Sequence, residues 1–330
     1  MYPAAPYAGG PYGGSPQVPS QAYGSFSGQP DPSAKFPPRG PRRRINAVPI
    51  FLSLFGPWLL FAVVYGAMTF SLHYEKPALV FIIVNLSFIV VIGVALAALS
   101  RLRKQAKKHP LYEASWLTFM FVTMLVGWTV AVVAGDMNYY QNMKLFYDLM
   151  NLNSYPEVDP AVTRGQMVMD AGRINFVADT HLDLKRSIGF KHNDVYCVAP
   201  VSKANKANST KGSLQTLSNY DFWAVGVNCC SGNEPDFHCG QYKSPSAHGG
   251  LRLMSDDERA FFRLAVQQAE AAYNIKATHP LFFHWMQDPQ QEVNSYHQRG
   301  ITNYLMGVFI FFSIQLFLVA AASLAFARLK

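Results

Sequence analysis

Four long stretches without a charged residue divide the chain, and polar segments separate them. These stretches occupy residues 49–72, 78–100, 116–135 and 301–327. Each reaches the roughly 18–20 residues that a helix needs to cross the hydrocarbon core of a bilayer. The alternative is a set of buried core helices in a globular protein, and four uncharged blocks of this length argue against it. The pattern therefore predicts an integral membrane α-helical protein with four transmembrane helices, TM1 to TM4, in the membrane bilayer.

Basic residues near the predicted spans indicate their orientation. Arginines cluster in RGPRRR before TM1, lysine and arginine fill the 101–115 loop, and two basic residues lie in the 328–330 tail. The long 136–300 loop instead holds 15 basic and 17 acidic residues, a net charge of −2. Because cytoplasmic loops carry the excess of Lys and Arg, we expect cytosolic termini and a lumenal or extracellular 136–300 domain. The overall charge of +8 then reflects topology, and no nucleic-acid partner is expected.

The segment before TM1 has a separate character. Residues 1–44 repeat Tyr, Pro, Gly and Ser and contain few branched apolar residues. Such a composition cannot bury enough apolar surface to offset its ordering entropy, so a disordered cytosolic tail is predicted. The same residues hold no apolar signal-peptide region, so TM1 is expected to act as the insertion signal. The tail is a candidate docking segment for a protein partner, with an inert solvated tail as the alternative.

Small residues recur at helical spacing in three of the spans. They are Gly93 and Ala97 in TM2, Gly127, Ala131 and Gly135 in TM3, and Ala321 and Ala325 in TM4. Small residues let helix backbones approach closely within lipid. We expect them to pack inside one four-helix bundle, with homo-oligomer formation as the alternative. Asn85 and Gln315 are expected to form hydrogen bonds between helices, and no ionisable residue lies deep in a span, which argues against a pump.

The 136–300 segment carries the pattern of a mixed α+β domain. Tyr139, Met143, Phe146 and Met150 continue TM3 as a helical stalk with one apolar stripe. Strand-like pieces at 174–184, 189–201, 220–230 and 251–254 follow, separated by turn residues.

Two helix starts are marked further along this domain. Ser255 and Glu258 form a capping box before a helix, and Asp288 with Pro289 starts another that leads to TM4. The aromatic run 279–286 between them is expected in the core of the domain. Phe222 and Trp223 alternate along one strand, so at least one of them should be buried.

All four cysteines, Cys197, Cys229, Cys230 and Cys239, fall in this domain. In an oxidising compartment four cysteines imply two disulfides with three possible connectivities. Neighbouring residues of a strand point to opposite faces, so Cys229 and Cys230 should bond different partners, Cys197 and Cys239, in an order left open. Asn208, in an Asn-Ser-Thr sequon, is a predicted glycosylation site.

Other chemistry is only weakly indicated. A zinc site formed by Cys229 or Cys230 with His238 and Cys239 lacks the Cys-x-x-Cys spacing of structural zinc sites, so no metal is expected. The closest His and Asp sets are Asp179 with His181, His192 with Asp194, and His279 with His284. No nucleophile motif or Gly-rich phosphate loop accompanies them. Neither catalytic residues nor a cofactor are therefore expected.

The layout resembles that of tetraspanins: four spans, a short first outer loop, a short basic inner loop and a large outer loop with a Cys-Cys pair. Cys229-Cys230-Ser231-Gly232 is similar to the tetraspanin Cys-Cys-Gly motif, and the resemblance makes Cys229 and Cys230 the matching residues. The phrases VYCVAP and FWAVGVNCC also resemble uncharacterised multi-span membrane proteins of dinoflagellates and related protists. These likenesses add no activity to the prediction.

Together these features favour a non-enzymatic membrane organiser, adhesion or scaffolding protein. Its 136–300 domain would bind a protein partner, while the plasma membrane or an endomembrane holds the spans. A transporter or channel subunit is the first alternative, and it would need a polar pathway through the spans. A lumenal enzyme is the second.

Overall fold

The computed structural model describes residues 47–105, 112–204 and 216–328. The predicted disordered tail 1–44, part of the basic 101–115 loop, the sequon at Asn208 and the last two residues lie outside this range. The predictions made for those positions stay predictions.

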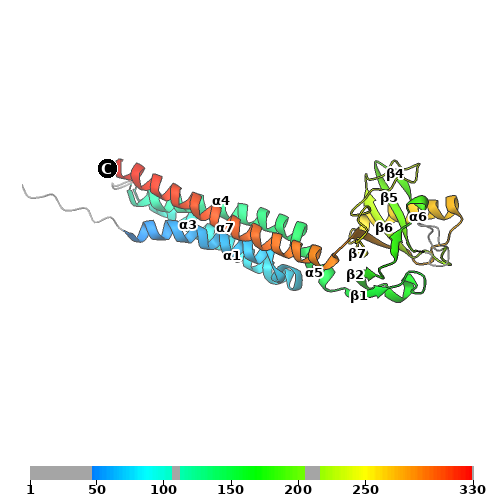
Figure 1. Ribbon diagram of the computed structural model, residues 1–330. Coiled ribbons are helices and arrows are strands. Elements are labelled where there is room, and N and C mark those ends of the chain that lie inside the picture. Colours follow the sequence, from blue (N-terminus) through cyan, green and yellow to red (C-terminus); the bar gives the residue numbers. More distant parts are fainter. Residues whose placement is uncertain (1–46, 106–111, 205–215, 329–330) are drawn as a thin grey trace, which may run out of the picture. The chain divides into compact units, whose positions relative to one another are not determined.

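Four helices in the described residues are long and apolar enough to cross a membrane. They are α1 (Ala47–Thr69), α3 (Pro77–Gln105), α4 (Tyr112–Asn138) and α7 (Pro289–Arg328), and the short α2 (Ser71–Glu75) joins the first two. Helices suit such sequences because each backbone N–H and C=O is satisfied within its own segment. Figure 1 shows the four helices running alongside one another. This confirms the four predicted apolar helices.

The central contacts of the helix bundle join α1, α4 and α7. Phe61 of α1 stacks on Phe311 of α7 with ring centroids 4.3 Å apart, and Ala131 of α4 is fully buried beside them. A Cβ atom on Gly127 would lie 2.7 Å from the Phe311 ring, and one on Gly135 would lie 2.5 Å from the Cβ of Met68. The small residues of α4 therefore let α1 and α7 pack closely against it.

The small residues of the other two helices need a correction. No atom lies within 4 Å of the position that a Cβ would take on Gly93, and Ala97 is exposed. Ala321 and Ala325 of α7 are exposed as well. These residues therefore lie outside the buried sides of α3 and α7, which carry larger side chains, among them Val91 and Val319.

Two polar residues of the helices behave differently. The Nε2 atom of the Gln315 side-chain amide donates a hydrogen bond to the Ser53 carbonyl of α1 at 2.6 Å, and Gln315 is buried. This confirms the predicted bond between helices. The Asn85 amide instead donates to the Phe81 carbonyl of its own helix, and its side chain is exposed. The predicted bond between helices is therefore wrong for Asn85.

The helix after α4 changes its winding before the sheet begins. A π-helical turn covers Tyr139–Met143, and α5 follows at Lys144–Met150. A π turn takes one residue more than an α turn, which displaces the predicted apolar stripe. Leu149 is consequently the buried residue at the end of α5, whereas Met150 is 46% exposed.

Between α5 and α7 the described residues form eight strands, one α-helix and two short 3-10 helices, Gly165–Val168 and Leu184–Arg186 (Figure 1). The strands are β1 (Asn153–Val158), β2 (Ala171–Phe176), β3 (Thr180–Leu182), β4 (Ile188–His192), β5 (Asp194–Lys203), β6 (Phe222–Val227), β7 (Gly249–Arg252) and β8 (Leu281–Met286). Their order is β1-β2-β7-β8-β6-β5-β3, and β4 also pairs with β5. The β1–β2 and β6–β8 pairs are parallel, and the other pairs are antiparallel.

Both faces of the sheet are covered. On one face Trp223 and Phe282 pack against Phe262 of α6 (Asp256–Tyr273). On the other face Phe222 and Phe283 pack with the cysteines. Phe222 and Trp223 are thus both buried, and the aromatic run of β8 lies in the core as predicted.

The predicted helix starts are also present. The hydroxyl of Ser255 accepts a hydrogen bond from the Glu258 backbone N–H. Asp288 accepts one from the Gln291 N–H, with Pro289 as the first helical residue. The helix that begins there continues without a break through the fourth apolar stretch, so α7 connects the sheet domain directly to the bundle.

Candidate functional site

The four cysteines form two disulfides at one end of the sheet. Cys197 of β5 bonds Cys230, with Cα atoms 5.9 Å apart, and Cys229 bonds Cys239, with Cα atoms 5.2 Å apart. The adjacent cysteines therefore have different partners, as predicted. The geometry differs from the prediction in one respect, because β6 ends at Val227 and Asn228 has a φ of +59°. A turn, rather than the alternation of a strand, directs the two side chains apart.

Glycines on the neighbouring strands make room for the two disulfides. A Cβ atom on Gly226 of β6 would lie 2.6 Å from the sulfur of Cys229. A Cβ atom on Gly189 of β4 would lie 2.7 Å from the sulfur of Cys230. Any larger residue at these positions would push a disulfide out of place. Sequence reasoning missed both glycines, because their role depends on strand pairing that brings distant residues together.

The loop between the cysteines is closed by a carboxylate. Both oxygens of Asp236 accept a hydrogen bond from the Ser231 backbone N–H at 2.9 Å. This bond lowers the pKa of Asp236 below its usual value. His238, a candidate ligand in the zinc alternative, forms a hydrogen bond with the Asp236 carbonyl instead. The sulfurs of Cys197, Cys229 and Cys239 lie within 4.8 Å of one another, but their disulfides leave no thiolate to bind a metal.

The three sets of His and Asp residues that lie close in the sequence make separate contacts in the structure. Asp179 and Asp159 form ion pairs with Lys203, and the bond with Asp159 is the main cause of the raised pKa of Lys203. His192 stacks on Phe261 with ring centroids 4.7 Å apart. In the third set, the backbone N–H of His279 binds Asp221. These contacts serve the packing of the domain.

Asp221 binds several parts of the domain, and sequence reasoning missed it. Its side chain is buried and accepts hydrogen bonds from the backbone N–H groups of Gly165, Thr278 and His279, at 2.8–3.0 Å. The Asn219 amide donates to it as well. The four bonds join the β1–β2 loop, the start of β6 and the segment before β8. Asp221 therefore holds three loops of the domain together.

A cavity of about 550 Å³ lies where β8 meets the first turns of α7. It is lined by Gly240, Gln241, His284, Trp285, Met286, Gln287, Asp288, Gln291, Glu292 and Ser295. Loss of solvent around the imidazole lowers the pKa of His284, and a hydrogen bond with the Val225 backbone opposes this effect. His284 nevertheless keeps part of its surface accessible to solvent and belongs to the lining of the cavity. Both carboxylates of the lining already have partners: Asp288 caps α7, and Glu292 accepts a hydrogen bond from Arg299.

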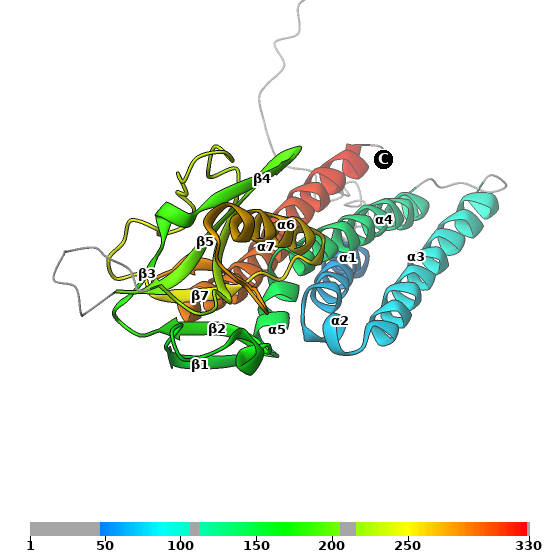
Figure 2. The ribbon, with the colours of Figure 1, turned by 90° about the vertical axis from the view of Figure 1, so that its right-hand side faces the viewer.

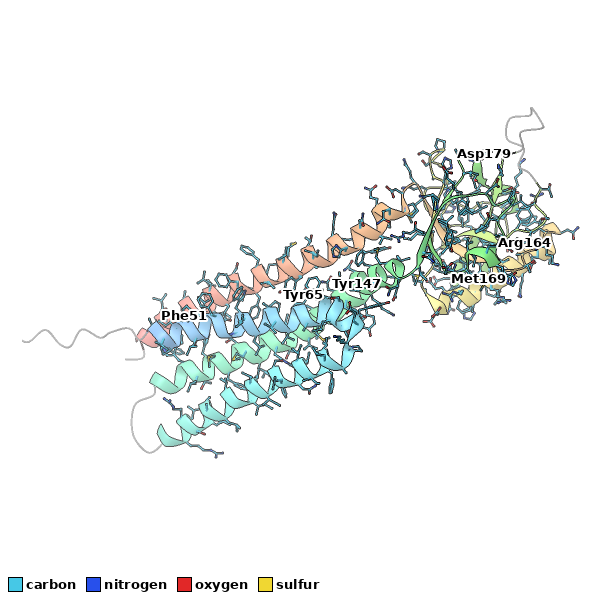
Figure 3. The ribbon with its side chains drawn as sticks, turned by 90° about the horizontal axis from the view of Figure 1, so that it is seen from below. Phe51, Tyr65, Tyr147, Arg164, Met169 and Asp179 are labelled. Atoms are coloured by element: carbon cyan, nitrogen blue, oxygen red, sulfur yellow. A yellow bond between two sulfur atoms is a disulfide. The ribbon has the colours of Figure 1, made fainter. Side chains whose placement is uncertain are left out.

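The loop between β1 and β2 exposes apolar side chains. Val162 is 77% exposed, Met167 is 69% exposed and Met169 is 58% exposed. Val168, between the two methionines, is buried and anchors the loop to the core. Figure 3 marks Arg164 and Met169 of this loop. Exposed apolar side chains on one loop make that loop a candidate interaction site.

Comparison of the chain with protein-family models, with curated proteins and with solved structures finds no match. The tetraspanin resemblance thus has no family match behind it. The four apolar helices and the disulfide-containing mixed sheet domain between the third and fourth of them are what the structure shows.

Proposed function

We propose that this chain is a non-enzymatic membrane protein that presents its sheet domain outside the cytosol to bind a protein partner. In this proposal α1, α3, α4 and α7 cross the membrane, and the basic residues beside them keep both termini in the cytosol. Two disulfides in the domain are consistent with an oxidising compartment. The resemblance to tetraspanin layout supports the same role as a membrane organiser.

The observation that carries this proposal is the exposed apolar loop between β1 and β2. The rest of the domain keeps most of its large apolar side chains buried, whereas this loop exposes Val162, Met167 and Met169. Asp221 and the buried Val168 hold the loop in place. An anchored loop with exposed methionines suits a protein partner with an apolar surface, because methionine adapts its shape to the surface it meets.

Site-specific photocrosslinking in the full-length chain, within intact membranes, tests this proposal. A photoreactive residue in place of Met167 should crosslink one protein in stoichiometric amount. The same residue in place of Leu264, an exposed apolar position of α6, should not. The variant Val162→Ser/Met169→Ser should abolish the crosslink while both disulfides still form. Equal labelling from both positions, or an unchanged crosslink in the variant, would contradict the proposal.

No specific observation favours the two alternatives. A transporter or channel subunit would use polar residues inside the spans, and Gln315 is engaged between helices. A lumenal enzyme would use the His and Asp sets, and these are spread over separate contacts of the domain.

A further inference from the structure

We propose that α3 carries an interface for a second copy of this chain, with Asn85 at its centre. The inference rests on the membrane placement of the proposed function, and it concerns a surface distant in sequence from the loop that would bind the partner. Its experiment reads self-association alone, so the two proposals can fail separately.

The helix α3 is the least enclosed of the four. In its span 11% of the residues are buried, against 17–22% in the other three. Its buried residues, Val80, Val91 and Ala98, recur at helical spacing and therefore lie on one side. Figure 2 shows α3 at the edge of the bundle. The opposite side of α3 consequently faces away from the other helices of the chain.

Asn85 lies on this outward side. It comes eight residues after Pro77, the first residue of α3, which places it about 12 Å along the helix at 1.5 Å per residue. Its Nδ2 atom donates to the Phe81 carbonyl at 2.7 Å. Within the residues that the structure describes, no group donates a hydrogen bond to the Oδ1 atom of Asn85. Lipid chains have no hydrogen-bond donor, so an amide at this depth requires a polar partner.

A second α3 meets this requirement better than any other occupant. The carboxamide has both a donor and an acceptor, so two Asn85 side chains related by a two-fold axis can satisfy each other. Ile82 lies three residues before Asn85, Ile89 and Gly93 lie four and eight residues after it, and all three share its side of the helix. Both isoleucines are 62% exposed, and the space next to Gly93 is open. A second backbone can approach closely there.

Cysteine crosslinking of the full-length chain in lipid vesicles tests this interface. All four native cysteines are in disulfides, so a cysteine introduced at Ile89 is the only free thiol for a short bis-maleimide. The Ile89→Cys chain should yield a crosslinked dimer at high lipid excess. Leu59→Cys, on the exposed side of α1, should yield only monomer. Equal yields from the two positions would overturn the proposal.

The role of the Asn85 amide is tested by a second substitution in the Ile89→Cys chain, with the same crosslinking measurement. Adding Asn85→Leu should weaken self-association about five- to thirty-fold, the change expected when an interhelical hydrogen bond is lost. Adding Asn85→Gln, which keeps an amide, should retain most of the dimer. An unchanged yield with Asn85→Leu would overturn the proposal. Crosslinking of Ile89→Cys to a different protein in cell membranes, with no dimer in vesicles, would also overturn it and assign the surface to another partner.

Discussion

At the scale of single residues, Asp221 contributes more to the domain than its place in the sequence suggests. It follows the short segment Leu217 to Tyr220, and no motif marks it. Its role arises because three backbone N–H groups from distant loops point at one buried carboxylate. Leaving such groups unpaired inside a protein is costly.

We therefore expect Asp221→Ala to lower the free energy of unfolding of the domain by about 3 kcal/mol or more, because several buried donors lose their acceptor at once. Chemical unfolding of the full chain in detergent, followed by tryptophan fluorescence, measures this change. Glu234→Ala, at an exposed position, is the matched control and should change stability by less than about 0.5 kcal/mol. Similar effects of the two substitutions would show that the Asp221 bonds carry little stability.

Residues with local roles could be predicted from the sequence, and residues with distant partners could not. Ser255 and Asp288 cap helices within three residues of themselves, so the local pattern identifies them. The adjacency of Cys229 and Cys230 predicted that they bond different partners. The pairing itself, and the need for Gly226 beside it, depend on the position of β5 next to β6. No local pattern contains that information.

At the scale of elements, continuous apolar runs identified the four helices, but two strands escaped prediction. β1 is an edge strand that contains Pro156, and most of its residues are exposed, so it lacks the apolar alternation of a strand. β8 is buried on both faces, and such strands read as uninterrupted apolar runs. The π-helical turn before α5 leaves no pattern either, because tertiary contacts decide where a helix takes up an extra residue.

The close contact of α1 with α4 gives a prediction at this scale. Gly135→Ala should destabilise the bundle by about 1–3 kcal/mol, because the new methyl group meets the Cβ of Met68 and forces the helices apart. Gly56→Ala on α1 is the matched control, since nothing lies within 4 Å of its added methyl group. That change should be neutral or slightly stabilising, as alanine favours helix more than glycine. Thermal unfolding of the detergent-solubilised chain compares the two, and equal midpoints would contradict the close contact.

At the scale of the whole molecule, charge and cysteine chemistry point to the same orientation. An excess of basic over acidic residues marks the segments before TM1 and between TM2 and TM3, while every cysteine lies in the sheet domain. The first pattern is typical of cytosolic loops, and the second of an oxidising compartment. Two independent kinds of residue thus support the proposed orientation, in which the domain lies on the side opposite the basic segments and can meet an external partner.

Glycan mapping tests this orientation directly, because glycans are added only on the lumenal side. The wild-type chain expressed in eukaryotic cells should lose mass on glycosidase treatment, and Asn208→Gln should abolish that shift. A sequon introduced into the 1–44 tail of the Asn208→Gln chain should stay unmodified, whereas one introduced at the exposed loop around Val162 should restore the shift. A glycan on the tail sequon would reverse the orientation. The disulfides would then have to survive in the cytosol, where glutathione and thioredoxin keep thiols reduced.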